Sequence, residues 1–175
     1  MKGKTILAVD PGTREIGVAV VEDGQLVRYE TKTNRTRKTP QEARAGVARI
    51  VRHLIIEYDP SVLAIKQPLI VQQSAATLAA VIKEIKGVAR KEGLLVREYA
   101  PKVLRQRICG AGRTTKRETA RCLSVRYPEL TRYAARESRS DELYYARLFE
   151  AVAVGLVCHQ DLAGSLPVKA NELLQ

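Results

Sequence analysis

The segment Asp10-Pro11-Gly12, followed by Gly17, holds the residues whose types and spacing best suit a chemical role. A carboxylate stands directly after the apolar run Thr5–Val9, and Pro and Gly then turn the chain away. Because open α/β sheets bind ligands beyond the carboxyl ends of their strands, Asp10 is placed to hold Mg²⁺, which prefers oxygen ligands. The alternative is an ordinary turn in which Asp10 accepts a hydrogen bond from a backbone N–H. Gly17 is expected to let the next strand lie close beside the first.

The positive charge of the chain is the second feature that points to function. Lys and Arg number 30 against 19 Asp and Glu, which gives a formal charge of +11. Twelve of the cations lie between Arg97 and Arg139 with only four acids, so about +8 of the charge is concentrated there. Such a field attracts polyanions, and counterion release from nucleic acid is the usual driving force. A solvated surface or the ion-pair networks of a heat-tolerant protein are the alternative explanations.

The cations best placed to hold phosphates flank a loop that contains Gly110 and Gly112. We expect them to bind the backbone of a nucleic acid, because contacts of this kind position a protein on its substrate. These candidate nucleic-acid-binding residues are Lys102, Arg105, Arg107, Arg113, Lys116 and Arg117.

The cysteines and histidines show no spacing typical of a metal site. Cys109, Cys122 and Cys158 are odd in number and predict buried thiols in a reducing compartment. His53 and His159 have no Cys or His beside them, so a zinc site is not expected. The first apolar run is too short for a signal peptide, and we expect a cytoplasmic protein with no membrane-spanning segment.

The elements that must position Asp10 follow from apolar runs and from the residues that interrupt them. Three runs joined by tight turns predict an antiparallel meander, and the later runs alternate with helical segments that begin at capping boxes. The predicted strands are Thr5–Val9, Gly17–Val21, Gln25–Lys32, Val62–Ile65 and Leu94–Tyr99. The predicted helices are Pro40–Tyr58, Ser74–Gly93, Pro101–Ile108, Lys116–Arg126 and Asp141–Cys158, the last capped by Ser140.

This order of elements predicts an α/β fold. Three antiparallel strands followed by β–α–β crossovers make a mixed five-stranded sheet with helices on both faces. The length fits one domain at 1–160, and a polar C-terminal tail is expected at 161–175.

The strand Ile6–Val9, the Asp10-Pro11-Gly12 turn, Gly17 and the order of elements resemble the RuvC-type Holliday junction resolvases of the ribonuclease H-like superfamily. The resemblance covers roughly residues 4–160. It implies a homodimeric endonuclease of DNA recombination and repair that nicks four-way DNA junctions. It also implies Mg²⁺, for which Mn²⁺ can substitute, held by four clustered carboxylates.

When the metal-binding positions of this family are carried over to the sequence, they assign Asp10 and Glu150 as metal ligands. The fourth strand should end beside a glutamate, but Lys66 stands there, and Arg147 stands where the last helix should carry an acid or His. An alternative register brings Asp141 or Glu142 into the site, although acids also suit the first turn of any helix. The resemblance further implies DNA contacts just after the fourth strand. A polar loop and helix start explains the same residues equally well, namely Gln67, Gln72 and Gln73.

The departures at Lys66 and Arg147 leave two main hypotheses open, beside a third in which Lys66 is an engineered, inactivating change. In the first, these cations pair with Asp10 and Glu150, metal binding is lost or weakened, and a nucleic-acid-binding protein remains. In the second, Lys66 points away, and Asp10, Glu150 and an acid of the last helix hold one Mg²⁺ for phosphodiester hydrolysis.

Two rival functions use the same superfamily fold. Sugar and acetate kinases often carry an Asp-x-Gly-Thr strand end such as the one at 10–13, but this chain is too short for their two domains and shows no second phosphate loop. An RNA-processing nuclease is the other rival, because positive charge does not separate DNA from RNA.

Overall fold

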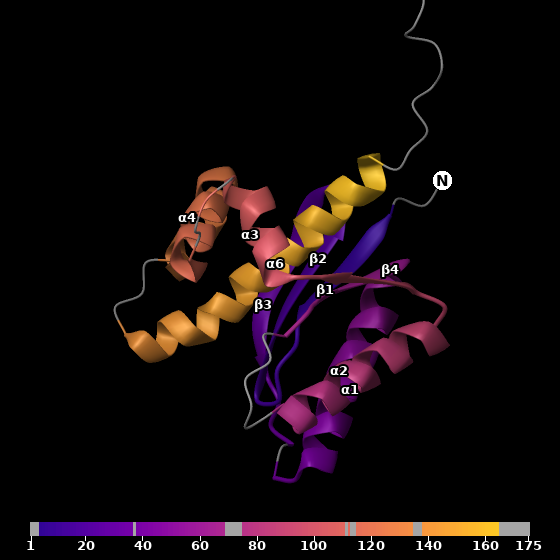
Figure 1. Ribbon diagram of the computed structural model, residues 1–175. Helices are drawn as coiled ribbons and strands as arrows, with labels where there is room; N and C mark the ends of the chain where they lie inside the picture. Colours follow the sequence, from indigo (N-terminus) through magenta and orange to yellow (C-terminus); the bar gives the residue numbers. More distant parts are fainter. Residues whose placement is uncertain are drawn as a thin grey trace, which may run out of the picture.

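The computed structural model describes residues 4–36, 38–68, 75–110, 112, 115–134 and 138–164. These residues form one five-stranded sheet in the order β3-β2-β1-β4-β5 (Figure 1). The strands are β1 (Thr5–Asp10), β2 (Glu15–Glu22), β3 (Gln25–Thr33), β4 (Val62–Lys66) and β5 (Leu95–Tyr99). The first three strands pair antiparallel, whereas β4 lies parallel to both β1 and β5. The predicted mixed sheet is confirmed.

Helices cover both faces of this sheet. The helical elements are α1 (Pro40–Tyr58), α2 (Ala75–Lys91), α3 (Pro101–Cys109), α4 (Lys116–Arg126), the short 3₁₀ helix η1 (Pro128–Leu130), α5 (Thr131–Ala134) and α6 (Arg139–Gly164). Helices α1 and α2 lie together on one face, and α6 crosses the other face with α3 and α4 beside it (Figure 1). None of the helices in the described ranges is long and apolar enough to cross a bilayer.

Alternation along the strands divides the interior into two cores. Successive strand side chains point to opposite faces of a sheet. In β1, Leu7 and Val9 join the core under α1 and α2, whereas Ile6 and Ala8 join the core under α3, α4 and α6. Because both faces are buried, the central strands are apolar throughout, as expected for strands covered by helices on both sides.

The helix starts show where local sequence determines structure. Thr39 and Thr115 each accept a hydrogen bond from the backbone N–H three residues on, and Glu42 and Glu118 bond back to the backbone of the cap. Both predicted capping boxes are therefore present, and they fix the starts of α1 and α4.

The last helix differs from the prediction at both ends. Its cap is Ser138 rather than Ser140, because the Ser138 hydroxyl accepts a hydrogen bond from the N–H of Asp141. The helix then continues to Gly164, past the predicted end at Cys158 and four residues into the segment predicted as a tail. No breaking residue lies between Cys158 and Gly164, and Leu162 still packs against the core.

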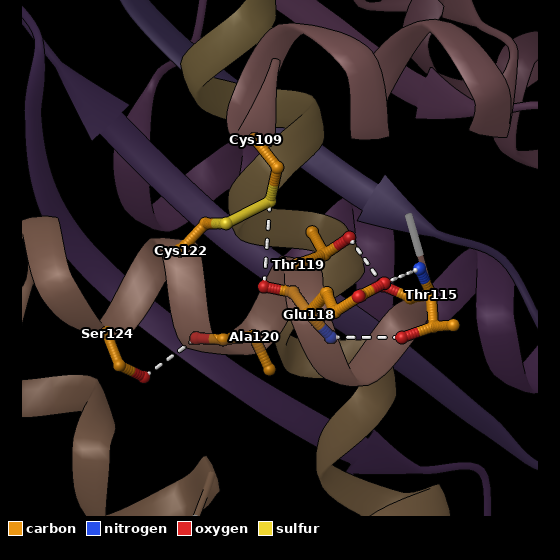
Figure 2. Close-up of a disulfide and its surroundings, with 7 residues drawn as sticks. All are labelled: Cys109, Thr115, Glu118, Thr119, Ala120, Cys122 and Ser124. Carbon is orange, nitrogen blue, oxygen red and sulfur yellow. Dashed lines mark hydrogen bonds between the residues drawn. A yellow bond between two sulfur atoms is a disulfide. The ribbon is translucent and has the colours of Figure 1, made fainter. Parts of the chain in front are cut away.

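The prediction of three buried thiols is wrong for two of the cysteines. Cys109 at the end of α3 and Cys122 in α4 form a disulfide, with their Cα atoms 5.8 Å apart (Figure 2). Their separation of 13 residues matches no spacing motif. Only the packing of α3 against α4 brings the sulfur atoms together, so the sequence pattern held no signal for the bond. Cys158 is a buried free thiol, as predicted.

Candidate functional site

The site begins where two parallel strands end side by side. Strands β1 and β4 pair in register, with Val9 opposite Ile65, so Asp10 and Lys66 follow as neighbours at the carboxyl ends. Asp10 lies two residues after Ala8, and Lys66 lies two residues after Ala64, so each points to the same face of the sheet as that alanine. Both side chains therefore belong to the face that α6 covers.

Helix α6 approaches this face unusually closely at Gly17. A Cβ at Gly17 would lie 1.9 Å from the backbone oxygen of Arg147, so only glycine permits the contact. We expected Gly17 to let the neighbouring strand come close, but the backbone of α6 is what it accommodates. At Gly12 a Cβ would lie 2.9 Å from the Arg147 guanidinium. Gly17 therefore seats α6 so that Arg147 and Glu150 reach the strand ends, whereas Gly12 leaves room for the tip of the Arg147 side chain.

The side chains that meet there form a closed ion-pair cluster. The Lys66 ammonium lies 2.8 Å from Asp10 Oδ1 and 3.0 Å from Glu150 Oε2, so one cation bridges the two carboxylates. Arg147 Nη1 lies 3.4 Å from Asp10 Oδ2 and donates a hydrogen bond of 3.1 Å to the Pro11 carbonyl. Asp10 therefore has a cationic partner on each of its oxygens.

Burial makes the pairing of these charges necessary. Asp10 and Glu150 are each 3% exposed, and Lys66 is 9% exposed. Burial raises the pKa of the Asp10 carboxyl above its ordinary value, and the positive charges of Lys66 and Arg147 act in the opposite direction. A buried carboxylate is stable only when it is paired and hydrogen-bonded, which is the role that these cations fill.

A third cation, Arg105 of α3, completes the cluster. Its Nη2 lies 3.8 Å from Glu150 Oε1. Its Nε is buried and has no hydrogen-bond partner, the one such side-chain atom found among the described residues. The sequence placed Arg105 among phosphate-binding candidates but gave no sign that it reaches Glu150, because that contact depends on how α3 packs against α6.

The other acids considered for the site lie elsewhere. Asp141 and Glu142 are exposed in the first turn of α6, and Glu142 faces a pocket beside α4. Eight residues separate Glu142 from Glu150, which is about 12 Å along a helix axis. The structure therefore brings Asp10, Lys66 and Glu150 together but leaves Asp141 and Glu142 outside.

The predicted nucleic-acid-binding residues are mostly at the surface. Gln67, Lys102, Lys116 and Arg117 are exposed, whereas Arg107 is paired with Asp161 and Gln160 of α6. Three further candidates lie outside the described residues, namely Gln72, Gln73 and Arg113.

Comparison with known proteins agrees with this architecture. A family model described as crossover junction endodeoxyribonuclease RuvC matches residues 6–143. The chain belongs to the RuvC family. A RuvC of Halorhodospira halophila is 35% identical over 120 residues, which cover 63% of this chain and 70% of that protein. A RuvC of Akkermansia muciniphila is 30% identical over 122 residues, covering 66% and 72%.

Solved structures extend the likeness over most of the chain. Thermus thermophilus RuvC in complex with a Holliday junction substrate aligns with a TM-score of 0.72 at 19% identity, covering 92% of this chain and 96% of that one. The yeast mitochondrial Holliday junction resolvase Ydc2 aligns with a TM-score of 0.68 at 8% identity, covering 91% and 80%. At these identities the structural matches establish the fold, and that fold is the ribonuclease H-like fold expected from the sequence.

RuvC proteins use divalent metal, and the residues of this chain do not fit such an ion. The Lys66 ammonium already bridges the two carboxylates that would hold it. Two like unit charges about 4 Å apart repel by about 4 kcal/mol at an effective dielectric constant of about 20, and a divalent ion doubles that figure. Within the described ranges, no group of three or more acidic, His or Cys side chains is arranged to hold a metal.

Proposed function

We propose that this RuvC-family protein binds four-way DNA junctions and holds them without cutting them. The observation that carries the proposal is the Lys66 ammonium, which lies within 3.0 Å of both Asp10 and Glu150. The ammonium of Lys66 bridges the two carboxylates that a nuclease would use to hold metal. The fold and the basic surface are retained, but the ligands for metal-dependent hydrolysis are occupied.

The charge of the cluster supports DNA binding without metal. Lys66, Arg105 and Arg147 contribute three positive charges against two negative charges from Asp10 and Glu150, which leaves +1. Bare carboxylates at this edge would repel a phosphate, whereas a net positive cluster attracts one. Arg105 and Arg147 are partly exposed, so their guanidinium groups could also contact a phosphate oxygen.

The rest of the proposed interface lies on α3 and α4. Lys102, Lys116 and Arg117 are exposed on these helices, beside the face of the sheet that carries the cluster. A four-way junction has arms related by symmetry, so we expect two copies of the chain to act as a homodimer. Because recombining DNA lies inside the cell, we expect the protein to work in the cytoplasm.

A Mg²⁺-dependent junction endonuclease is the second candidate. One observation favours it: both carboxylates, Asp10 and Glu150, are present, buried and close enough to share one cation. If the flexible Lys66 side chain left the site on DNA binding, these two carboxylates would be free to hold one ion. Mn²⁺ would substitute for Mg²⁺ in that case.

The experiment that separates these functions uses a labelled four-way junction and a duplex of equal length. Fluorescence anisotropy measures binding with EDTA and with Mg²⁺ or Mn²⁺, and denaturing gels detect nicked strands. We expect the wild type to bind the junction at least about tenfold more tightly than the duplex, equally well in EDTA, and to leave every strand intact.

The control is Asp10→Asn, which removes one negative charge from the cluster. We expect this variant to bind the junction at least as tightly as the wild type. Nicking by the wild type in Mg²⁺ that disappears in Asp10→Asn would contradict the non-cleaving role. Equal affinity for junction and duplex would contradict junction recognition.

A further inference from the structure

A pocket of about 660 Å³ lies between α4, α5 and the first half of α6, apart from the ion-pair cluster. Its volume falls in the range of small-molecule sites, roughly 300–1,000 Å³. Its inner wall is aromatic, with the rings of Tyr133 and Tyr145 5.2 Å apart and Phe149 of α6 beside them. Rings in this arrangement offer faces and edges on which a flat, apolar group can stack.

Two exposed apolar side chains stand among the lining residues. Val125 of α4 is 82% exposed and Leu143 of α6 is 62% exposed, and each belongs to a different wall. Exposed apolar side chains that converge on one pocket indicate a ligand surface, whereas isolated ones need no explanation.

The polar lining of the pocket is cationic. Helix α4 contributes Lys116, Arg117 and Arg121, and the single acid of the lining is Glu142, so these four residues sum to +2. The pocket therefore combines an aromatic interior with a positive rim. This pairing fits a ligand that has a flat ring and an adjacent negative group, which is the chemistry of a nucleotide.

The pocket and the cluster share one helix. Tyr145 and Phe149 line the pocket, whereas Arg147 and Glu150, on the same two turns of α6, belong to the cluster. An unstacked base of a bound strand would enter the pocket while its phosphate meets the α4 cations.

We propose that this pocket receives an unpaired nucleotide of the bound DNA, so that the preferred ligand is a junction with an extrahelical base near its crossover. This inference rests on the proposed junction-binding function and adds a specificity to it. The recognising chemistry is aromatic stacking on Tyr133 and Tyr145 together with phosphate contacts from Lys116, Arg117 and Arg121. Stacking tolerates any base, so the preference concerns the unpaired state rather than the base sequence.

The test uses two four-way junctions that differ at one position beside the crossover. In one, 2-aminopurine is paired with thymine; in the other, it is an additional, extrahelical base. Anisotropy of a dye on a distant arm measures affinity, and 2-aminopurine emission reports stacking. We expect the wild type to bind the extrahelical junction about fivefold or more tightly, with quenched 2-aminopurine emission in the complex.

Two variants probe the pocket and one serves as control. Tyr145→Leu removes a stacking ring, and Val125→Glu places a negative charge at an exposed position that can be changed without disturbing the fold. Ile56→Glu introduces the same charge at an exposed apolar residue of α1, on the other face of the sheet. We expect both pocket variants to lose the preference for the extrahelical junction, and Ile56→Glu to retain it.

Equal affinity of the wild type for the two junctions, or a preference that survives both pocket variants, would overturn this inference alone. Failure to bind either junction better than duplex would overturn the proposed function itself, so the two failures are distinguishable. If Val125→Glu instead converted a dimer of the free protein to monomer in sedimentation, a second copy would be the occupant, and the assignment to DNA would be overturned.

Discussion

Lys66 determines what the two buried carboxylates of this site can do. In a strand end that binds metal, an acid at this position would add a third negative charge, whereas the Lys66 ammonium offsets one of the two negative charges of Asp10 and Glu150. Charge and burial together make Lys66 a structural residue. Its removal should therefore affect stability, with a dependence on pH that identifies the carboxylates.

Lys66→Met should lower the free energy of unfolding by about 3 kcal/mol or more at pH 7, because it leaves buried carboxylates without their main partner. The pKa of Asp10, raised by burial from an ordinary value of 3.8, should rise further once Lys66 no longer opposes that effect. A carboxyl with a higher pKa in the folded state stabilises the fold when protonated, and this stability is lost as pH rises through that pKa. The difference in free energy of unfolding between the wild type and Lys66→Met should therefore become smaller as pH falls from 7 towards 4.

Urea unfolding across this pH range measures the effect. The control is Lys86→Met, which removes the partner of Glu98 in an exposed pair of 3.0 Å. Pairs of that kind contribute at most about 1 kcal/mol. Lys66→Met could instead lose no more free energy of unfolding than the control, or lose the same amount at every pH. Either result would show that Lys66 is not the partner that stabilises the buried acids.

Only Asp10 was indicated by the local pattern of residues. The resemblance to RuvC-type resolvases brought Glu150, Lys66 and Arg147 to the same site, and their pairing with the acids was one of the hypotheses that it left open. The alternative register with Asp141 or Glu142 arose because helix periodicity does not say which turn of a long helix crosses the strand ends. The role of Arg105 needed the packing of α3 on α6, which no local pattern encodes.

Gly17 of β2 determines how closely α6 can approach the sheet. The backbone of α6 lies against β2 there, and any side chain would push the helix away from the strand ends. Gly17→Ala should lower the free energy of unfolding by about 3 kcal/mol, at the upper end of the usual cost of overpacking. It should also weaken junction binding, because Arg147 and Glu150 move with the helix.

The matched control is Gly87→Ala in α2, where a Cβ would meet nothing within 4 Å. That change should stabilise the protein by up to about 1 kcal/mol through helix propensity. Thermal and urea unfolding of the two variants measure the contrast. A neutral Gly17→Ala would mean that α6 is not held by this close contact.

Elements were predicted well wherever a local signal exists. The tight turns between the first three strands, the capping boxes at Thr39 and Thr115 and the β-branched runs determine most of the observed boundaries. The disulfide between Cys109 and Cys122 and the true end of α6 depend on tertiary packing. Sequence spacing alone could not have found either of them.

The distribution of charge governs how the whole molecule meets DNA. Each phosphate neutralised by a cation contributes about −0.9 to the slope of log affinity against log salt concentration on duplex arms. Lys116→Gln/Arg117→Gln on α4 should therefore reduce the magnitude of this slope for junction binding by about 2. Arg49→Gln/Arg52→Gln removes the same charge from exposed positions of α1, on the opposite face, and should leave the slope unchanged.

Anisotropy titrations at several salt concentrations give these slopes. If both double variants reduced the magnitude of the salt slope equally, the net charge of the chain, rather than the cations of α4, would be what attracts the DNA. The net charge of +11 could be read from the sequence, but the separation of these cations onto different faces required the fold.

Isothermal titration with Mn²⁺ most directly tests whether Lys66 and Arg147 have taken the place of metal. We predict that the wild type gives no saturable heat up to millimolar Mn²⁺. Lys66→Glu/Arg147→Asp, which replaces both cations with acids beside Asp10 and Glu150, should bind at least one ion. Saturable uptake by the wild type, abolished by Asp10→Asn, would show that the cluster opens to admit metal and would contradict the account.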